Sequence, residues 1–141
     1  MIAEFVDSNV LVYAFDFSAG LKRSIAGNLL KRLDEGGNGG LSTQVLTEFY
    51  SVATCKLGMA SVDAEQVIRD LAPWALHRPD HAGVLRACEL HRRFGLAWWD
   101  AVLVQSAIEL QCEVLWTEDL SAGQRFGPVT VRNPFAEGVS V

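Results

Sequence analysis

The chain has 141 residues, of which 50% are hydrophobic and 21% are charged, as is typical of one globular domain. Its net charge of −5 disfavours a protein that covers nucleic acid with a broad basic surface, because neutralising phosphates requires an excess of Lys and Arg. No apolar run approaches the roughly 20 residues of a membrane span, and the N-terminal segment carries an acid early, unlike a secretion signal, so we expect a cytoplasmic protein without membrane contact.

The first half of the chain contains two expected strands, each followed by a helix. The opening strand runs into a polar turn that starts at Asp7. Glycines at positions 36, 37, 39 and 40 break the chain after the first helix, and Ser42 or Thr43 is a suitable N-cap for the second helix. The expected elements are a strand over 2–6, a helix over 21–33, a strand over 41–43 and a helix that ends by Gly58.

The second half of the chain continues this alternation with more helix than strand. Pro73 stops one helix, Gly95 closes the next, and Trp98-Trp99-Asp100 opens the last. The expected elements are a helix from Ser61 to before Pro73, a strand over 74–76, helices over 80–94 and 98–110, and strands over 113–117 and 129–131.

Strands that alternate with helices of ten or more residues indicate βα crossovers and a parallel sheet with helices on both faces. We therefore predict an α/β fold of three layers, α/β/α, around a central, mostly parallel sheet of four to five short strands. The length favours a single domain over residues 1–141. In such sheets, ligands bind outside the carboxyl ends of the strands.

Four acids stand where those carboxyl ends are expected. Asp7 and Asp119 each follow a strand, whereas Glu48 and Asp100 lie early in helices. In a parallel sheet the four can converge, and carboxylates that converge repel one another unless a cation compensates. Mg²⁺ and Mn²⁺ prefer such oxygen ligands. Taken singly, each acid also has an ordinary structural explanation, such as a turn cap for Asp7 or a favourable helix N-terminus for Asp100.

Five segments of the chain resemble the PIN-domain nucleases, and most closely the VapC-type toxins of bacterial toxin–antitoxin pairs. The segments follow the order and spacing of that family over essentially the whole chain. They are Phe5–Leu11, Ser42–Phe49, Trp99–Ala101, Leu115–Leu120 and Asn133–Phe135. The resemblance implies a PIN-like fold, an endoribonuclease that depends on Mg²⁺ or Mn²⁺ and hydrolyses RNA phosphodiester bonds, a homodimer, and inhibition by a cognate antitoxin.

The resemblance also implies a role for particular residues. The catalytic acids of the family correspond here to Asp7, Glu48, Asp100 and Asp119. The expected metal ligands are Asp7 and Asp100 directly and Asp119 directly or through water, while Glu48 would ligate the metal or position the attacking water. Smaller polar side chains that support the site in the family correspond to Ser8, Asn9 and Thr117.

A phosphatase of the haloacid-dehalogenase type is the nearest alternative fold, because it too begins with a strand that ends in Asp. Its mechanism needs a second acid two residues later, where this chain has Asn9, and a late lysine, whereas the lysines here are Lys22, Lys31 and Lys56. A zinc protein is also disfavoured, because the three cysteines form no C-x-x-C unit.

Two alternative functions stay open within the family reading. A PIN nuclease can serve RNA maturation instead of acting as a toxin, and only analogy with short toxins favours the latter. A module that binds RNA or a partner without cutting is disfavoured by the intact acids, because an acidic pocket repels phosphate unless a metal ion intervenes.

Several aromatic residues have no role in this scheme. Trp98 and Trp99 either stack on RNA bases, pack in the core or form a dimer interface, and the last two are more common for large aromatics. Phe15, Phe17 and Tyr50 suggest an apolar groove for a helix of the antitoxin.

Overall fold

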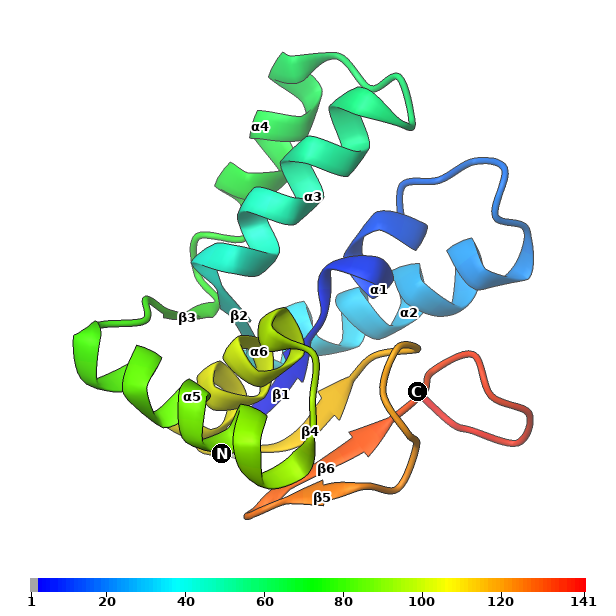
Figure 1. Cartoon of the computed structure of the whole chain (residues 1–141). Helices are drawn as coiled ribbons and strands as arrows, with labels where there is room; N and C mark the ends of the chain where they lie inside the picture. The colour runs from blue at the N-terminus through cyan, green and yellow to red at the C-terminus, as the bar shows by residue number, and fades with distance from the viewer. Residues whose placement is uncertain (1–2) are drawn as a thin grey trace.

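The computed structural model describes residues 3–141, which form a six-stranded sheet with helices packed around it (Figure 1). The strands lie in the order β3-β2-β1-β4-β6-β5, and every pair is parallel except β5 with β6. They are β1 (Ala3–Val6), β2 (Gly39–Ser42), β3 (Ala75–His77), β4 (Cys112–Trp116), β5 (Arg125–Phe126) and β6 (Val129–Arg132). The predicted α/β fold with a mostly parallel central sheet is confirmed, although the sheet has more strands than expected.

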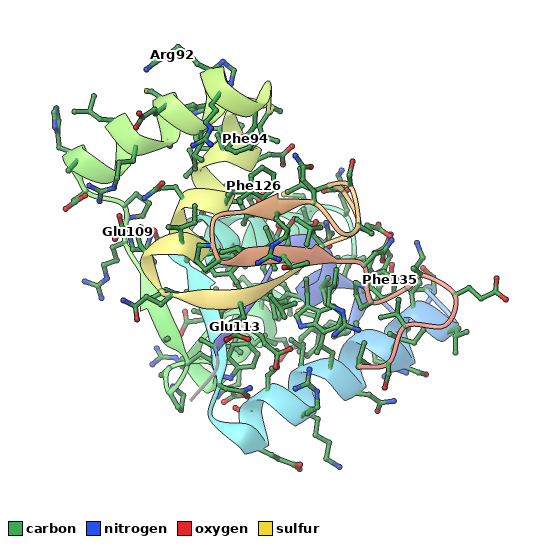
Figure 2. All side chains as sticks on the ribbon, turned by 90° about the horizontal axis from the view of Figure 1, so that it is seen from below. Arg92, Phe94, Glu109, Glu113, Phe126 and Phe135 are labelled. Atoms are coloured by element: carbon green, nitrogen blue, oxygen red, sulfur yellow. The ribbon has the colours of Figure 1, made fainter. Side chains whose placement is uncertain are left out.

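The helices of the described residues cover both faces of this sheet. They are α1 (Ser8–Tyr13), α2 (Leu21–Gly36), α3 (Thr43–Cys55), α4 (Ser61–Asp70), α5 (His81–Phe94) and α6 (Trp98–Glu109). Seen from below in Figure 2, α2 lies on one side of the sheet and α5 with α6 on the other, which gives the three expected layers. Within residues 3–141, no helix combines the length and the apolar character needed to cross a membrane.

The centre of the sheet is formed by β1 and β4, whose neighbouring side chains are fully buried. Phe5, Val6, Leu115 and Trp116 all have no exposed surface. The helix α6 packs on this centre, and every residue over 101–107 is buried. A segment that is buried all round needs apolar or small residues on every face, as this one has except at Gln105, whose Nε2 donates to Glu109 at 2.9 Å. Its position brings the first turn of α6 to the carboxyl edge of the sheet.

The sequence predicts a polar turn after the first strand. This prediction is wrong, because a helix begins there. Asp7 is the N-cap of α1, and its Oδ1 accepts a hydrogen bond from the backbone N–H of Ser8 at 2.6 Å. The helix is only six residues long, and such a segment is too short to display helical periodicity. It buries Val10 and Leu11 in the core. Asp7 is thereby held between a central strand and a packed helix.

The glycines at positions 39 and 40 were expected only to break the chain, but they begin β2. A Cβ atom on Gly39 would lie 2.3 Å from the ring of Trp74, so glycine is required there for the close approach of the indole. Gly39 has no positive φ, and its role is therefore one of space and not of turning the chain.

Candidate active site

Parallel pairing brings two of the predicted acids together at the carboxyl edge of the sheet. β1 and β4 are neighbours, with Val6 opposite Trp116, so the chain leaves both strands at the same level. The backbone N–H of Asp7 donates to the carbonyl oxygen of Trp116 at 3.0 Å, which extends this pairing by one residue. Thr117 follows Trp116 directly, and Asp119 lies two residues further along the chain.

The two other acids come from helices that begin at the same edge. The Oγ of Ser42 accepts a hydrogen bond from the backbone N–H of Val45 at 3.3 Å, which confirms Ser42 as the N-cap of α3, and Glu48 lies in the second turn of that helix. Asp100 lies in the first turn of α6. Burial, followed by the negative charges of Asp119 and Glu48, raises the pKa of Asp100.

Asp7 is the most enclosed of the four acids, with only 5% of its surface exposed. Its Oδ2 accepts a hydrogen bond from the hydroxyl of Thr117 at 2.8 Å, while its Oδ1 accepts the N–H of Ser8. These bonds favour the charged form, yet burial outweighs them and raises the pKa to about 6, with further contributions from the charges of Asp119 and Glu48.

Asn9 and Thr117 connect Asp7 to Asp119. The Nδ2 of Asn9 donates to Oδ2 of Asp119 at 3.0 Å and to Oδ2 of Asp7 at 3.2 Å, so one amide group bridges two carboxylates. The Oγ1 of Thr117 accepts from the backbone N–H of Asp119 at 3.1 Å. The Oδ1 of Asn9 is buried without a hydrogen-bond partner among the described residues. The predicted supporting residues therefore lie among the acids.

Glu48 is held by hydrogen bonds to both of its carboxylate oxygens. Oε2 accepts the hydroxyl of Ser8 at 2.7 Å, and Oε1 accepts the Nε2 of Gln44 at 3.1 Å. The same Nε2 donates to the carbonyl oxygen of Trp99 at 3.2 Å, next to Asp100, so Gln44 links α3 to the start of α6. Gln44 was not among the site residues predicted from the sequence. The signal was its position one helical turn before Glu48, where two side chains share a face.

Among residues 3–141, no Lys or Arg forms an ion pair with this acidic cluster. Lys22 pairs instead with Glu118. Within the same residues, no three acidic, His or Cys side chains form a ready cage for a metal ion. Mg²⁺ does not need such a cage, because it keeps several water molecules and binds through one or two carboxylates. The donor set, with the unpaired Oδ1 of Asn9, therefore suits a hydrated divalent ion and not a caged zinc ion.

Glu118 lies outside the cluster, although it precedes Asp119 in sequence. Its carboxylate accepts the hydroxyl of Tyr13 at 2.6 Å and the ammonium of Lys22 at 2.9 Å. The Nζ of Lys22 also lies 4.8 Å from the ring centroid of Tyr13 and 5.3 Å from that of Phe135. Glu118 thus attaches the loop after β4 to α1 and α2.

A family model described as the PIN domain matches residues 5–123 of this chain. No curated protein matches it in sequence. The fold resembles a toxin–antitoxin complex from Klebsiella pneumoniae, with a TM-score of 0.70, 19% sequence identity, and coverage of 94% of this chain and 98% of that chain.

Two further solved structures are similar at comparable identity. VapC20 from Mycobacterium tuberculosis, a toxin that cleaves the sarcin-ricin loop, has a TM-score of 0.66 and 17% identity, and the match covers 83% of this chain and 92% of that chain. VapBC2 from Rickettsia felis, bound to a DNA fragment from its promoter, has a TM-score of 0.64 and 20% identity, with coverage of 94% and 98%. These likenesses establish a shared fold.

Proposed function

The chain belongs to the PIN-domain family, and from this premise we propose that it is a metal-dependent endoribonuclease that hydrolyses RNA phosphodiester bonds. We further propose that it acts as the toxin of a VapBC-like toxin–antitoxin pair, since toxins of such pairs share its fold. The observation that carries the proposal is the convergence of Asp7, Glu48, Asp100 and Asp119 at one edge of the sheet, where none of them forms an ion pair with a residue of the described range 3–141. The domain would span the whole of residues 1–141.

Each residue of the cluster has a definite part in the proposed chemistry. Asp7 and Asp100 would hold Mg²⁺ or Mn²⁺ directly and Asp119 directly or through water, and the ion would activate water and stabilise charge on the reacting phosphate. Glu48 is fixed by Ser8 and Gln44, so that its carboxylate can orient the attacking water and accept a proton from it. Asn9 and Thr117 keep the carboxylates of Asp7 and Asp119 from turning away from each other.

The proposed binding of an antitoxin has structural support of its own. A cavity of about 320 Å³ between α1, α2 and α4 has mostly apolar walls, which include Leu11, Phe15 and Leu71, together with the charged residues Lys31, Asp34 and Asp70. We propose that an amphipathic helix of the antitoxin occupies it, a mode of recognition that uses apolar anchors at helical spacing. Of the aromatic residues expected in such a groove, Phe15 lines it, whereas Phe17 and Tyr50 do not line it. A homodimer stays a prediction from the family resemblance.

The proposed function is tested with purified protein and a mixed RNA pool in Mg²⁺, Mn²⁺ or EDTA. Cleavage should require the metal and should be abolished in the double variant Asp7→Asn, Asp100→Asn. The matched control is Glu113→Gln, which removes an exposed acid near the amino end of β4, whereas the cluster lies at the carboxyl end of that strand. Metal binding is measured separately by calorimetry with Mn²⁺. Cleavage that persists in the double variant, or that proceeds in EDTA, would contradict the proposal.

A further inference from the structure

A cavity of about 640 Å³ lies between α3, α5 and α6, directly beside the acidic cluster. We call it the α3–α6 cavity. Glu48 is both a member of the acidic cluster and part of the cavity wall. Gln44 also lines the cavity, and its amide joins Glu48 to the backbone of Trp99. The cavity and the acidic cluster are therefore two parts of one continuous surface.

The two walls of this cavity differ in chemistry. The wall from α5 and α6 is apolar and aromatic, with Val84, Trp98 and Trp99. The wall from α3 is polar but mostly uncharged, with the hydroxyls of Thr43 and Thr47 beside the amide of Gln44. No Lys or Arg lines it, so the cavity is unsuited to a phosphate group. A flat, uncharged group with an apolar face and a hydrogen-bonding edge fits both walls.

The exposure of Trp99 also indicates that a flat, uncharged group binds in this cavity. Its side chain keeps 64% of its surface exposed, although tryptophan is among the residues that gain most from burial. By contrast, Trp116 is fully buried in the core. Trp99 and Glu48 line the same cavity, so a group stacked on the indole would lie close to this member of the acidic cluster. Single-stranded RNA is bound in this manner, because every base offers a π-face.

We propose that the α3–α6 cavity binds one nucleobase of the substrate RNA, stacked on Trp99, next to the phosphodiester bond that the acids attack. This inference rests on the proposed function and assigns a substrate contact to residues outside the acidic cluster. The polar wall of α3 then meets the hydrogen-bonding edge of the base, so Thr43 and Thr47 influence which base is accepted. In this scheme Trp99 contributes affinity for a base of any kind, and Thr43 and Thr47 contribute the selectivity.

The first test uses nucleosides, which carry no phosphate, so the experiment needs neither a metal ion nor RNA cleavage. Adenosine, guanosine, cytidine and uridine are titrated separately in EDTA while the indole N–H resonances of the four tryptophans are followed by NMR. At least one nucleoside should shift the resonance of Trp99 in a saturable manner and leave those of Trp74 and Trp116 unchanged. Trp99→Phe assigns the resonance. If no nucleoside shifts it, the proposal is overturned.

The second test measures binding of fluorescein-labelled RNA octamers, one for each base and one abasic, in the presence of Ca²⁺. Trp99→Ala should weaken binding of the preferred octamer by about 5- to 150-fold, as expected for loss of one stacked base, and should not weaken binding of the abasic octamer. Trp99→Phe should recover part of the loss. Phe17→Ala is the control, because it removes an aromatic side chain that is 83% exposed outside the cavity.

The outcomes distinguish this inference from the proposed function. If the wild type cleaves RNA but Trp99→Ala binds every octamer as tightly as the wild type, the nuclease stands and the base-binding cavity is wrong. If the wild type cleaves no RNA yet nucleosides still shift the resonance of Trp99, the proposed nuclease fails instead.

Light scattering provides a further check on what occupies the cavity. A dimeric wild type that becomes monomeric on Trp99→Ala, with no response to nucleosides, would assign the cavity to a second copy of the chain.

Discussion

At the scale of single residues, the burial of Asp7 opposes its proposed function, because burial disfavours the charged carboxylate that would bind a metal ion. Its pKa of about 6 means that the folded protein holds this proton more tightly than the unfolded chain, whose ordinary value is 3.8. The metal-free fold therefore loses stability as pH rises through that interval, by an amount of the order of 3 kcal/mol. A divalent ion removes this penalty when it binds, so its affinity should fall as the pH drops below about 6.

We predict that Asp7→Asn changes the pH dependence of stability in the metal-free protein. Because the amide does not titrate, the variant should gain stability relative to the wild type as pH rises from about 4 to about 7. Urea unfolding in EDTA at several pH values measures the difference. The prediction fails if the two proteins keep a constant difference in free energy of unfolding over that range.

Gln44 is the residue-scale feature that the sequence analysis missed. We predict that Gln44→Ala lowers the catalytic rate constant of the proposed nuclease by about tenfold, because a carboxylate displaced by an ångström can cost up to about 100-fold. The control is Gln66→Ala on α4, which removes an equivalent bond from Nε2 to Asp70 at 2.8 Å. Steady-state cleavage assays compare the two variants. Equal rates for the two variants would mean that Gln44 does not position Glu48.

At the scale of elements, the long helices and most of the strands were predictable, whereas α1 and β5 were not. The helices over 21–36 and 81–94 have apolar periodicity and clear end signals, so their prediction from sequence was straightforward. The helix α1 has six residues and β5 has two, which is too little for any period to emerge. Tertiary contacts determine β5. Phe126 is buried there against Phe94 of α5, with ring centroids 5.0 Å apart (Figure 2).

The proximity of Asp7 and Asp119 was predictable because parallel topology places the ends of β1 and β4 together. The glycines of β2 were not, since the sequence does not reveal that an indole 35 residues later approaches Gly39. The same limit applies to the contacts of Asn9, which bonds to residues more than 100 positions away. Periodicity reports which face of an element is buried, whereas such contacts depend on the packing of the whole chain.

We predict opposite effects for two glycine-to-alanine substitutions. Gly39→Ala should reduce the free energy of unfolding by about 1–3 kcal/mol or more, because its Cβ would overlap the ring of Trp74. Gly27→Ala in α2 should increase it by about 0.5–1 kcal/mol, because its Cβ meets nothing within 4 Å and alanine favours the helix. Chemical denaturation of both variants tests the pair. Similar stability of the two would refute the packing role of Gly39.

At the scale of the whole molecule, two polar networks lie toward opposite ends of β1. The acidic cluster stands at the carboxyl end, while Glu4 lies toward the amino end and accepts two hydrogen bonds from Arg32 of α2, at 2.9 and 3.0 Å. The indole of Trp116 donates to the same carboxylate at 2.8 Å. The hydrogen bonds from Arg32 are the main reason that the pKa of Glu4 lies below its ordinary value. This network joins helix to sheet and is separate from the proposed chemistry.

We predict that Glu4→Gln lowers stability without lowering the activity per folded molecule. The free energy of unfolding at pH 7 should fall by about 1–3 kcal/mol, the usual range for hydrogen bonds to a charged group. The contribution of Glu4 is present above pH 4.5 and is lost as the pH falls through its lowered pKa, so the effect should shrink in acid. Glu65→Gln, which breaks an exposed pair with Arg69 on α4, is the control and should change stability by less than about 0.5 kcal/mol.

Both edge strands of the sheet are short, and this limits how another polypeptide can add a strand to the sheet. β3 has three residues and β5 has two, so each outer strand offers only a few backbone groups to an incoming chain. Short outer strands are a common protection against edge-to-edge aggregation. They also leave little room for β-augmentation, in which a partner adds a strand to the sheet. We therefore expect a protein partner to bind through the helices and loops of this domain, and mutations in the partner should then matter most at its side chains.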